Sequence, residues 1–506
     1  MEFIKKHPII FCLIVALVLR LFSVVFSKGY MASDDHFETV QVAWQGVQKG
    51  LLDEGGHLRW NDLAPTKINR SPLYNVGLYL NMKIMMWLGC ESLDCAMYGI
   101  RLRHALISLI PVLFGMLYVS RATRDKKYVL LAGLILGAHF LMPYLSVRTL
   151  IEKVAEVMLV PSVFLAYVGV KDKNDKWLVL SGILGGVAWM IRFNTGICLV
   201  FMAPAIWYAA KNIRPMIAFC IGVAIMILLS GALDLYFYGQ FAVSTTNLIH
   251  SALELQQTGG PLPQPFWIYI PLIFGIFIPP FSLYFILTFF RRELIREHII
   301  LLAAVAAFVI SHSLITHKEE RYMASVFSLL TVMGTIGLWA WLKTVAFDSW
   351  KFRLFKVSAW IAVVLNIILL PIFTLNYAHK GMVEPFVYLS NRDDVRAVLV
   401  DRTERLRLLP VSYAGLITPP IKILDNRDIV TDFRGLVTLM RDINYVIVYS
   451  DNFAEDHRRT LEIFLGPLEP VFHSTPSTVD RLLHFMNPKH NHTNEAWIYK
   501  TTGNIQ

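Results

Sequence analysis

The chain has 506 residues, of which 55% are hydrophobic and 17% are charged. Soluble domains carry about 25% charged residues, so this composition excludes an ordinary soluble protein. The formal net charge of +10 does not indicate nucleic-acid binding, because the basic residues gather in short clusters between apolar runs, where they act as topology signals. We therefore predict a polytopic α-helical membrane protein whose surroundings are the lipid bilayer, with no nucleic-acid partner.

Eleven apolar runs are candidates for membrane spans. The first, residues 8–26, follows a basic start as in a signal peptide, but it is too long for the apolar region of one and has no small-residue cleavage site. We therefore expect it to remain as a span. The other runs are residues 107–120, 128–145, 155–170, 178–191, 196–209, 216–233, 267–290, 299–315, 322–342 and 357–375.

Clusters of Lys and Arg fall in every second connection between these runs. By the positive-inside rule the N-terminus is then cytoplasmic, and an odd number of spans places the C-terminal region on the opposite side. We expect that side to be periplasmic or lumenal, with a bacterial inner membrane favoured over the endoplasmic reticulum. The connections assigned to this non-cytoplasmic face are residues 28–102, the loop around Arg148, the turn near Arg192, residues 235–266 and residues 317–321.

The long first outer loop, residues 28–102, contains two adjacent carboxylates, Asp34 and Asp35. Ser33 is the expected N-cap of an amphipathic helix that lies along the membrane surface and holds both of them beyond the first span. Neighbouring helical side chains point about 100° apart, so we do not expect a symmetric dyad. One carboxylate can remove the proton of an attacking sugar hydroxyl while the other organises the loop. The alternative is an acidic pair that only favours the helix dipole.

The rest of this loop has two further features. Residues 73–88 are weakly amphipathic, and both an interfacial helix and a re-entrant helix remain open for them. Cys90 and Cys95 lie close together on the non-cytoplasmic side, where a small local disulfide can form. No Cys/His spacing in the chain is typical of a zinc site, so we expect no metal.

A segment of consecutive polar residues, 316–321, separates two late apolar runs. After Thr316 it contains an imidazole, two cations and two carboxylates at the membrane boundary, where ionisable groups are costly and tend to be functional. Opposite charges this close suit a mutually paired cluster. The alternative is an ordinary charged loop that anchors helix ends.

Isolated cations occur on the same outer face. Guanidinium binds phosphate bidentately and always carries its charge, so cations that converge on one aqueous pocket would suit a phosphate leaving group. The alternative for each is a snorkelling anchor at the membrane boundary. Glu152 and Glu156, with Lys153 between them, indicate a polar patch between helices. The isolated cations are Arg70, Arg148, Arg192, Lys318 and Arg321.

We divide the chain into a transmembrane domain, residues 1–376, and a small α/β domain, residues 377–506. In the second, strands are predicted at 406–409, 421–424, 445–449 and 496–499, and helices at 433–440, 454–464 and 479–485. This alternation indicates parallel strands with crossover helices. The domain contains neither a glycine-rich phosphate loop nor a nucleophile elbow, so we interpret it as a structural or acceptor-positioning lid.

Residues 317–322, His-Lys-Glu-Glu-Arg-Tyr, resemble the HKEER(F/Y) signature of glycosyltransferase family 22. Its members are the lipid-phosphate-mannose-dependent α-mannosyltransferases of N-glycan and GPI-anchor assembly. Residues 33–38 are similar to the first-loop pattern of the family, although Ser33 and Asp35 replace its usual Pro and Glu. Further similarities are Arg70-Ser71 to an Arg-Ser pair, residues 148–150 to a Thr-Leu loop, and residues 234–239 to an Asp-x-x-Phe-Tyr-Gly element.

The resemblance implies a GT-C fold and a metal-independent, inverting transfer of a hexose, expected to be mannose, without a cofactor. The donor would be a polyprenyl- or dolichyl-phosphate sugar, and the acceptor a lipid-linked or GPI-like glycan. Asp34 aligns with the first-loop Asp of the family and is the expected general base, with Asp35 as the other catalytic candidate. By the same resemblance, His317, Lys318 and Arg321 would neutralise the departing phosphate, and Glu319 and Glu320 would hold these cations or contact sugar hydroxyls.

Two other functions remain open. The first keeps the fold and changes the donor sugar to glucose, arabinose or an amino sugar. The second is a lipid-linked saccharide transporter or flippase, which usually shows paired repeats and helices broken at mid-membrane. Pro279-Pro280 breaks one run, but polar residues do not gather there.

Overall fold

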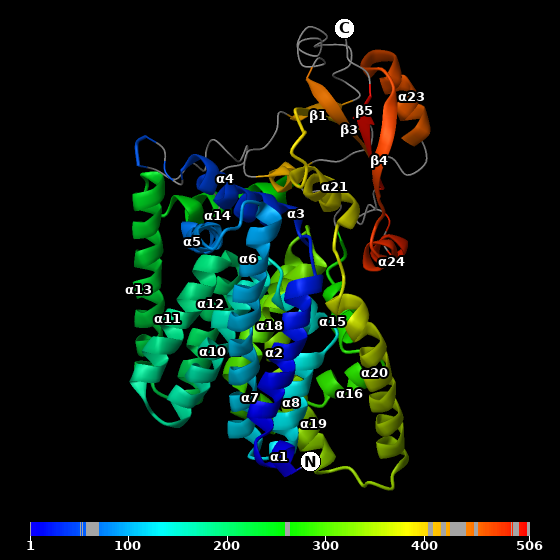
Figure 1. The fold of residues 1–506 in the computed structure, drawn as a ribbon. Helices are drawn as coiled ribbons and strands as arrows, with labels where there is room; N and C mark the ends of the chain where they lie inside the picture. Colours follow the sequence, from blue (N-terminus) through cyan, green and yellow to red (C-terminus); the bar gives the residue numbers. More distant parts are fainter. Residues whose placement is uncertain are drawn as a thin grey trace. The chain divides into compact units, whose positions relative to one another are not determined.

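The computed structural model describes residues 2–50, 52, 54–56, 70–258, 264–402, 408–415, 421–425, 442–449, 454–486, 488 and 495–502. The chain divides into two compact units (Figure 1). Unit 1 comprises Met1–Ser23, Leu52–Tyr74 and Leu102–Thr374, and unit 2 comprises Val24–Leu51, Asn75–Arg101 and Leu375–Gln506. Unit 2 therefore combines two stretches of the first outer loop with the C-terminal region.

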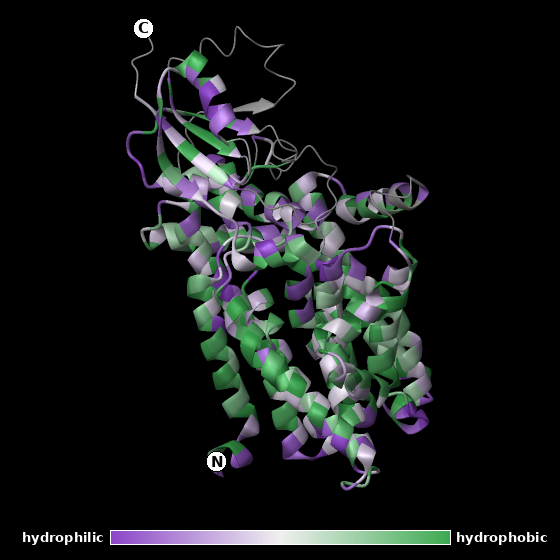
Figure 2. Cartoon of the chain, turned by 90° about the vertical axis from the view of Figure 1, so that its right-hand side faces the viewer, coloured by the Kyte–Doolittle hydropathy of each residue, from purple (hydrophilic) through white to green (hydrophobic). Residues whose placement is uncertain are grey.

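Unit 1 is a bundle of helices that run mainly along one axis (Figure 1). Hydrophobic residues cover most of the length of these helices, and hydrophilic residues gather near the helix ends (Figure 2). Its helices include α2 (Pro8–Phe26), α7 (Leu109–Thr123), α8 (Lys126–Ala138), α9 (Leu141–Ser146), α10 (Ile151–Lys171), α11 (Asp175–Ile191), α12 (Gly196–Ala210), α13 (Ile213–Tyr238), α14 (Val243–Thr258), α15 (Tyr269–Ile276), α16 (Phe281–Leu287), α17 (Arg292–Glu297), α18 (Ile299–Leu314), α19 (Phe327–Leu342) and α20 (Trp350–Thr374).

Among the described residues, six helices are long and apolar enough to cross a membrane. They are Pro8–Phe26, Leu93–Thr123, Ile151–Lys171, Phe193–Ala210, Ile213–Tyr238 and Trp350–Thr374, and each overlaps a run predicted as a span. A seventh span arises if the bent pair α15 and α16 is counted as one, and α18 and α19 are shorter apolar helices.

Three predicted runs are less regular than expected. The run 267–290 is two helices bent by 112°, with Pro279-Pro280 at the break, as the two prolines indicated. The run 128–145 is interrupted between α8 and α9. The run 322–342 begins as a 3₁₀ turn, η3 (Glu320–Ser325), and becomes α-helical only at Phe327.

Helices α10 and α20 mark the inside and the outside of the bundle. In the 18-residue apolar stretch of α10, 78% of the residues are buried, whereas in that of α20 only 11% are buried. Large apolar side chains such as Trp360 and Ile367 on α20 are exposed. Since exposed apolar surface of this extent is stable only against hydrocarbon, we interpret the outer side of α20 as a lipid-facing surface.

Glycines bring α11 and α13 into close contact. A Cβ atom at Gly222 would overlap the carbonyl oxygen of Val179, and one at Gly182 would overlap that of Phe219. Small residues at such positions let helix backbones approach closely, which is how helices associate in membranes. The α11–α13 pair therefore depends on these two glycines.

We expect Gly222→Ala to destabilise the protein by about 1–3 kcal/mol, because the added methyl group meets backbone atoms that cannot rotate away. Thermal unfolding in detergent, followed by circular dichroism, would measure the change. Gly275→Ala is the matched control, since nothing lies within 4 Å of a Cβ built there. Equal melting temperatures for both variants would show that the close approach of the α11 and α13 backbones does not contribute to stability.

Arg20 is a buried cation within the first span. Its Nε donates to Ser108 Oγ at 2.8 Å, and its Nη1 donates to the carbonyl oxygens of Ala16 at 3.1 Å and Gly137 at 3.2 Å. Its Nη2 reaches the carbonyl of Leu136 at 3.4 Å. Arg20 thus satisfies the last carbonyl groups of α8, where the helix is interrupted.

The first-loop part of unit 2 is helical. Helix α3 (Ser33–Asp35) continues through a π-helical turn, η1 (His36–Val40), into α4 (Gln41–Lys49). The predicted helix is therefore present, but Ser33 as its N-cap is wrong. The N-cap is Ala32, and no side chain caps the helix there, because Ser33 is already in the first turn. Cys90 and Cys95 form the predicted disulfide, between α5 (Pro72–Trp87) and α6 (Leu93–Ile107).

The C-terminal part of unit 2 is a five-stranded sheet of order β2-β1-β3-β5-β4. Strand β1 is parallel to β2 and β3, as predicted, whereas β5 is antiparallel to β3 and β4, where the prediction of parallel strands is wrong. The elements are α21 (Lys380–Ser390), β1 (Ala397–Arg402), η4 (Val411–Ala414), β2 (Ile421–Asp425), β3 (Ile443–Tyr449), α23 (Ala454–Leu465), β4 (Leu468–Ser474), α24 (Thr478–Met486) and β5 (Ala496–Thr501).

Most of the predicted C-terminal elements that lie in the described residues are present. The strands at 421–424, 445–449 and 496–499 and the helices at 454–464 and 479–485 are confirmed. The helix at 433–440 lies outside the described residues, and so do residues 406–407 of the strand at 406–409, whose other two residues are not in a strand. Strand β1 and strand β4 were not predicted, and β4 is irregular around Pro470.

Candidate functional site

Within unit 1, the polar segment 317–321 lies between the end of α18 and the start of η3. Glu319 is its centre: His317 Nε2 lies 3.0 Å from Glu319 Oε1, and Arg321 Nε donates to Glu319 Oε2 at 2.6 Å. The hydroxyl of Tyr322 also donates to Glu319 Oε1, at 3.3 Å. The prediction that the charged groups of this segment pair with one another is therefore confirmed for His317, Glu319 and Arg321.

Lys318 is held differently from its neighbours. Its side chain is buried, and its ammonium group donates to the carbonyl oxygen of Gln264 at 3.0 Å and to that of Ile315. Ile315 is the C-cap of α18, so the ammonium satisfies a carbonyl at the end of that helix. A contact between Lys318 and phosphate remains a prediction.

The buried carboxylate of Glu152, in the first turn of α10, joins two of the predicted cations. Arg192 Nη2 lies 2.8 Å from Glu152 Oε1, and Arg321 Nε lies 4.0 Å from the same oxygen. Glu152 is 1% exposed, whereas Arg192 is 14% exposed, so the carboxylate lies at the bottom of this group. The guanidinium groups of Arg192 and Arg321 also lie 5.4 Å and 5.7 Å from the ring of Tyr322.

On α10, Lys153 directly follows Glu152 and forms a second buried ion pair with Glu156, one turn further along the helix. Glu156 Oε1 also accepts a hydrogen bond from the backbone N–H of Ser328 at 2.7 Å, which links α10 to α19. The interpretation of these residues as a polar patch between helices is confirmed. Glu152 belongs to the same helix, but its carboxylate lies beside Arg192 and Arg321.

The remaining cations have other contacts. Arg148 is buried, and its guanidinium lies 4.5 Å from the ring of Tyr144. The backbone carbonyl of Arg70 accepts a hydrogen bond from the hydroxyl of Tyr238 at 3.1 Å, at the end of α13. The structure thus brings Arg192 and Arg321 to Glu152, and Arg321 joins this carboxylate to Glu319 and, through it, to His317. Arg148 and Arg70 contact tyrosines elsewhere in unit 1.

The group contains polar residues that the sequence did not single out. His312 Nε2 lies 3.3 Å from Asn194 Nδ2, and its ring meets that of Tyr322 edge to face at 5.5 Å. The hydroxyl of Tyr269 donates to the backbone carbonyl of Glu319 at 3.2 Å. A histidine inside an apolar run was a signal that could have identified His312, because neutral imidazole in a span usually has a polar partner.

Asp34 and Asp35 belong to α3 in unit 2. Asp35 is 1% exposed, whereas Asp34 is partly accessible to solvent. The backbone carbonyl of Asp35 accepts a hydrogen bond from Thr39 Oγ1, within the π-helical turn. The two carboxylates thus differ in access, as expected for neighbouring residues with separate roles. That they share a cavity with residues 317–321 remains a prediction.

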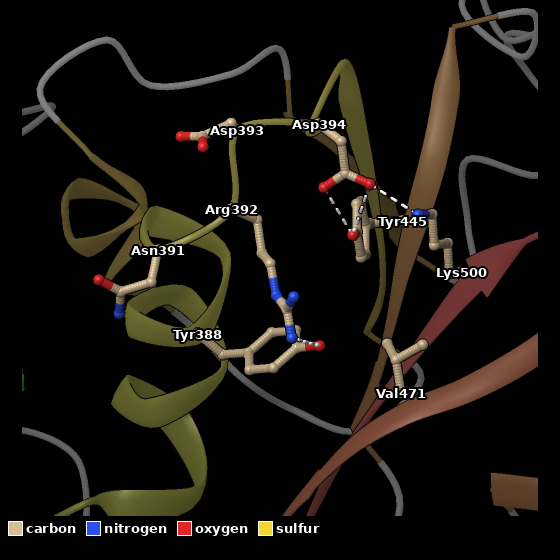
Figure 3. A pocket seen from close by; sticks show the side chains of 8 residues that line it. All are labelled: Tyr388, Asn391, Arg392, Asp393, Asp394, Tyr445, Val471 and Lys500. Atoms are coloured by element: carbon tan, nitrogen blue, oxygen red, sulfur yellow. Dashed lines mark hydrogen bonds and ion pairs between the residues drawn. The ribbon is translucent and has the colours of Figure 1, made fainter.

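A cavity of about 400 Å³ lies in unit 2, between the end of α21 and the sheet (Figure 3). Asp394 accepts hydrogen bonds from the hydroxyl of Tyr445 and, at 2.6 Å, from Lys500 Nζ. Arg392 donates to the hydroxyl of Tyr388 at 2.7 Å. Since Asp394 precedes β1 and its partners Tyr445 and Lys500 lie in β3 and β5, we interpret these contacts as a structural link between the end of α21 and the sheet. Within the described residues, no group of three His, Cys, Asp or Glu side chains could hold a metal ion.

Comparisons with known proteins show what the chain resembles. The chain is similar to the crystal structure of ArnT from Cupriavidus metallidurans bound to undecaprenyl phosphate, with a TM-score of 0.62 and 13% identity over 97% of this chain and 98% of that chain. It is also similar to the archaeal oligosaccharyltransferase AglB from Archaeoglobus fulgidus in complex with an inhibitory peptide and a dolichol-phosphate. Here the TM-score is 0.50 and the identity 11%, over 94% of this chain and 75% of that chain. Among curated proteins no sequence matches.

These likenesses confirm the predicted GT-C fold. A family model, that of the Alg9-like mannosyltransferases, matches residues 10–398. This range includes the first outer loop, the Glu152 group and the segment 317–321, and so it confirms the family that the HKEER-like segment indicated. The chain therefore belongs to the Alg9-like mannosyltransferase family and is a membrane glycosyltransferase.

Proposed function

We propose that the protein transfers a hexose, mannose, from a polyprenyl-phosphate donor to a hydroxyl of a lipid-linked or GPI-like glycan. The transfer inverts the anomeric carbon, needs no metal, and takes place on the non-cytoplasmic face of the membrane. The observation that carries the proposal is that Arg192 and Arg321 are brought together by Glu152 and Glu319, two of these four residues belonging to the signature segment of the family. The undecaprenyl phosphate and dolichol-phosphate bound by the two structural relatives support the class of donor.

The two guanidinium groups suit the departure of the phosphate. The bond between the anomeric carbon and the phosphate oxygen breaks, and both electrons leave with the phosphate. Arg192 and Arg321 would stabilise this growing negative charge, since guanidinium forms short, charge-assisted hydrogen bonds with phosphate. Glu152 and Glu319 hold the two guanidinium groups in place before the donor binds.

The acceptor hydroxyl attacks the anomeric carbon from the face opposite the phosphate. A new carbon–oxygen bond forms, and the hydroxyl proton passes to a carboxylate. Partial exposure of Asp34 supports this residue as the base, because a substrate must reach it. Burial of Asp35 supports a structural role for the second carboxylate.

Purified protein with synthetic polyprenyl-phosphate-mannose and a lipid-linked glycan would test the reaction. We expect a lengthened glycan and free polyprenyl phosphate in equal amounts, and no turnover with a nucleotide sugar. Turnover only with a glucose, arabinose or amino-sugar donor would keep the enzyme class and change the sugar. Movement of lipid-linked glycan across a vesicle membrane without any turnover would instead favour a transporter.

The proposal requires a cytoplasmic N-terminus and a non-cytoplasmic first loop. In this proposal residues 1–376 form the transmembrane catalytic domain, and residues 377–506 form a domain on the non-cytoplasmic side. Reporter fusions would test this topology: a C-terminal alkaline phosphatase should be active outside the cytoplasm. A C-terminal reporter that is active only in the cytoplasm would contradict the proposed face.

A further inference from the structure

Four aromatic rings form a column inside unit 2. The ring of Tyr30 stacks on His379 on one side and on His36 on the other, with centroids 4.6 Å apart and interplanar angles of 11° and 13°. The ring of His36 also stacks near Tyr413, at 5.6 Å and 12°. The two middle rings, Tyr30 and His36, belong to the first outer loop, and the two end rings, His379 and Tyr413, belong to the C-terminal region.

Backbone contacts also connect the first outer loop to the C-terminal region. The N–H of Ala378 donates to the carbonyl of Lys28 at 3.0 Å, and Gly29 pairs with Ala378 as a parallel β-bridge. Gly29 has φ of +77°, and a Cβ atom there would overlap the carbonyl oxygen of Ala378. His379 Nδ1 lies 3.0 Å from the carbonyl oxygen of Tyr30. Residues 28–30 are therefore joined to residues 378–379 by both backbone and side-chain contacts.

His36 is the member of the column next to the carboxylates. It is fully buried, and within the described part of the chain neither of its ring nitrogens has a hydrogen-bond partner. Burial lowers the pKa of His36 to about 3, so the ring is neutral at physiological pH. A neutral ring without polar contacts contributes its flat faces, and both faces are occupied by tyrosine rings.

We propose that this column, His379-Tyr30-His36-Tyr413, is a positioning device through which the C-terminal region fixes the direction of α3 and thus of Asp34. The inference rests on the proposed function of Asp34 as the base. It assigns the C-terminal region a direct part in turnover: its residues Tyr413 and His379 hold the first-loop helix without touching the substrate. Small displacements of a catalytic group lower the rate strongly, since about 1 Å can cost roughly 10²-fold.

The test compares Tyr413→Ala with Tyr413→Phe in the full-length protein. Tyr413→Ala removes the end ring of the column, and we expect kcat to fall by roughly 10²-fold with little change in KM for donor or acceptor. Tyr413→Phe keeps the ring and should restore kcat. A merely structural role would instead lower the melting temperature of Tyr413→Ala and leave the activity of the remaining folded protein unchanged.

Hydrogen exchange gives a measurement that does not depend on activity. We expect Tyr413→Ala to exchange faster than the wild type in residues 33–49, and Tyr413→Phe to exchange like the wild type. Unchanged exchange in this segment, or faster exchange throughout the chain, would overturn the proposal. If the wild type shows no transfer with any lipid-phosphate sugar, the proposed function fails, and the exchange measurement still decides whether the column positions α3.

Discussion

Replacement of Asp34 by Asn should lower kcat by about 10²–10⁴-fold, because an amide of the same shape cannot accept the proton of the acceptor hydroxyl. Asp34 is partly accessible and lies in the first turn of α3, which no side chain caps. Folding should therefore be little affected. Steady-state kinetics with a synthetic donor would measure the loss, and the melting temperature would show that the variant is folded.

Two matched variants make this result specific. Glu91→Gln removes an exposed carboxylate from the same unit and should leave kcat unchanged. Asp35→Asn changes a carboxylate that is 1% exposed, so we expect a loss of stability as well as of rate. Full activity of Asp34→Asn together with an inactive but folded Asp35→Asn would identify Asp35 as the general base.

Glu152→Gln should have the largest effect on stability, about 3–5 kcal/mol. The change leaves the guanidinium groups of Arg192 and Arg321 near a buried site without their common carboxylate. Removal of one member of a buried ionic group costs this much because an uncompensated charge remains. Thermal unfolding in detergent would detect it as a large fall in melting temperature.

The control for this variant is Glu320→Gln, in the same signature segment but exposed, which should melt like the wild type. The double variant Glu152→Gln/Arg192→Gln should be less destabilised than the sum of the two single variants, because it removes both partners of one pair. If the two single effects simply add, Glu152 does not balance the charge of Arg192, and the arrangement proposed for the phosphate site is wrong.

Local sequence properties were sufficient for much of the fold. Apolar runs of about 20 residues predicted many helices of unit 1, because a helix that crosses hydrocarbon must be mostly apolar over its length. Pro279-Pro280 predicted the break between α15 and α16, since proline cannot continue an interior helix. The pairing of Glu319 with His317 and Arg321 was also predictable, because groups of opposite charge two residues apart can meet without any contact from elsewhere in the chain. The contacts of Lys318 with backbone carbonyls were not predictable in this way.

Other features depend on residues far apart in the chain. Arg20 meets the end of α8, and Glu152 meets Arg192 and Arg321, through packing that no local pattern describes. Strand β4 was missed because Pro470 and irregular alternation hide it, although its pairing with β5 stabilises it in the sheet.

The sequence by itself determined the class of the protein: a helical membrane glycosyltransferase with a signature segment of paired charges between two late helices. Hydrophobicity and charge indicate the helical membrane class, and the resemblance of residues 317–322 to a family signature implies the glycosyltransferase. Only the tertiary structure decided that residues 28–36 of the first loop belong with residues 378–379 and Tyr413 of the C-terminal region. The physical reason is that such contacts arise from shape and from ring packing between segments separated by hundreds of residues, which hydrophobic periodicity does not encode.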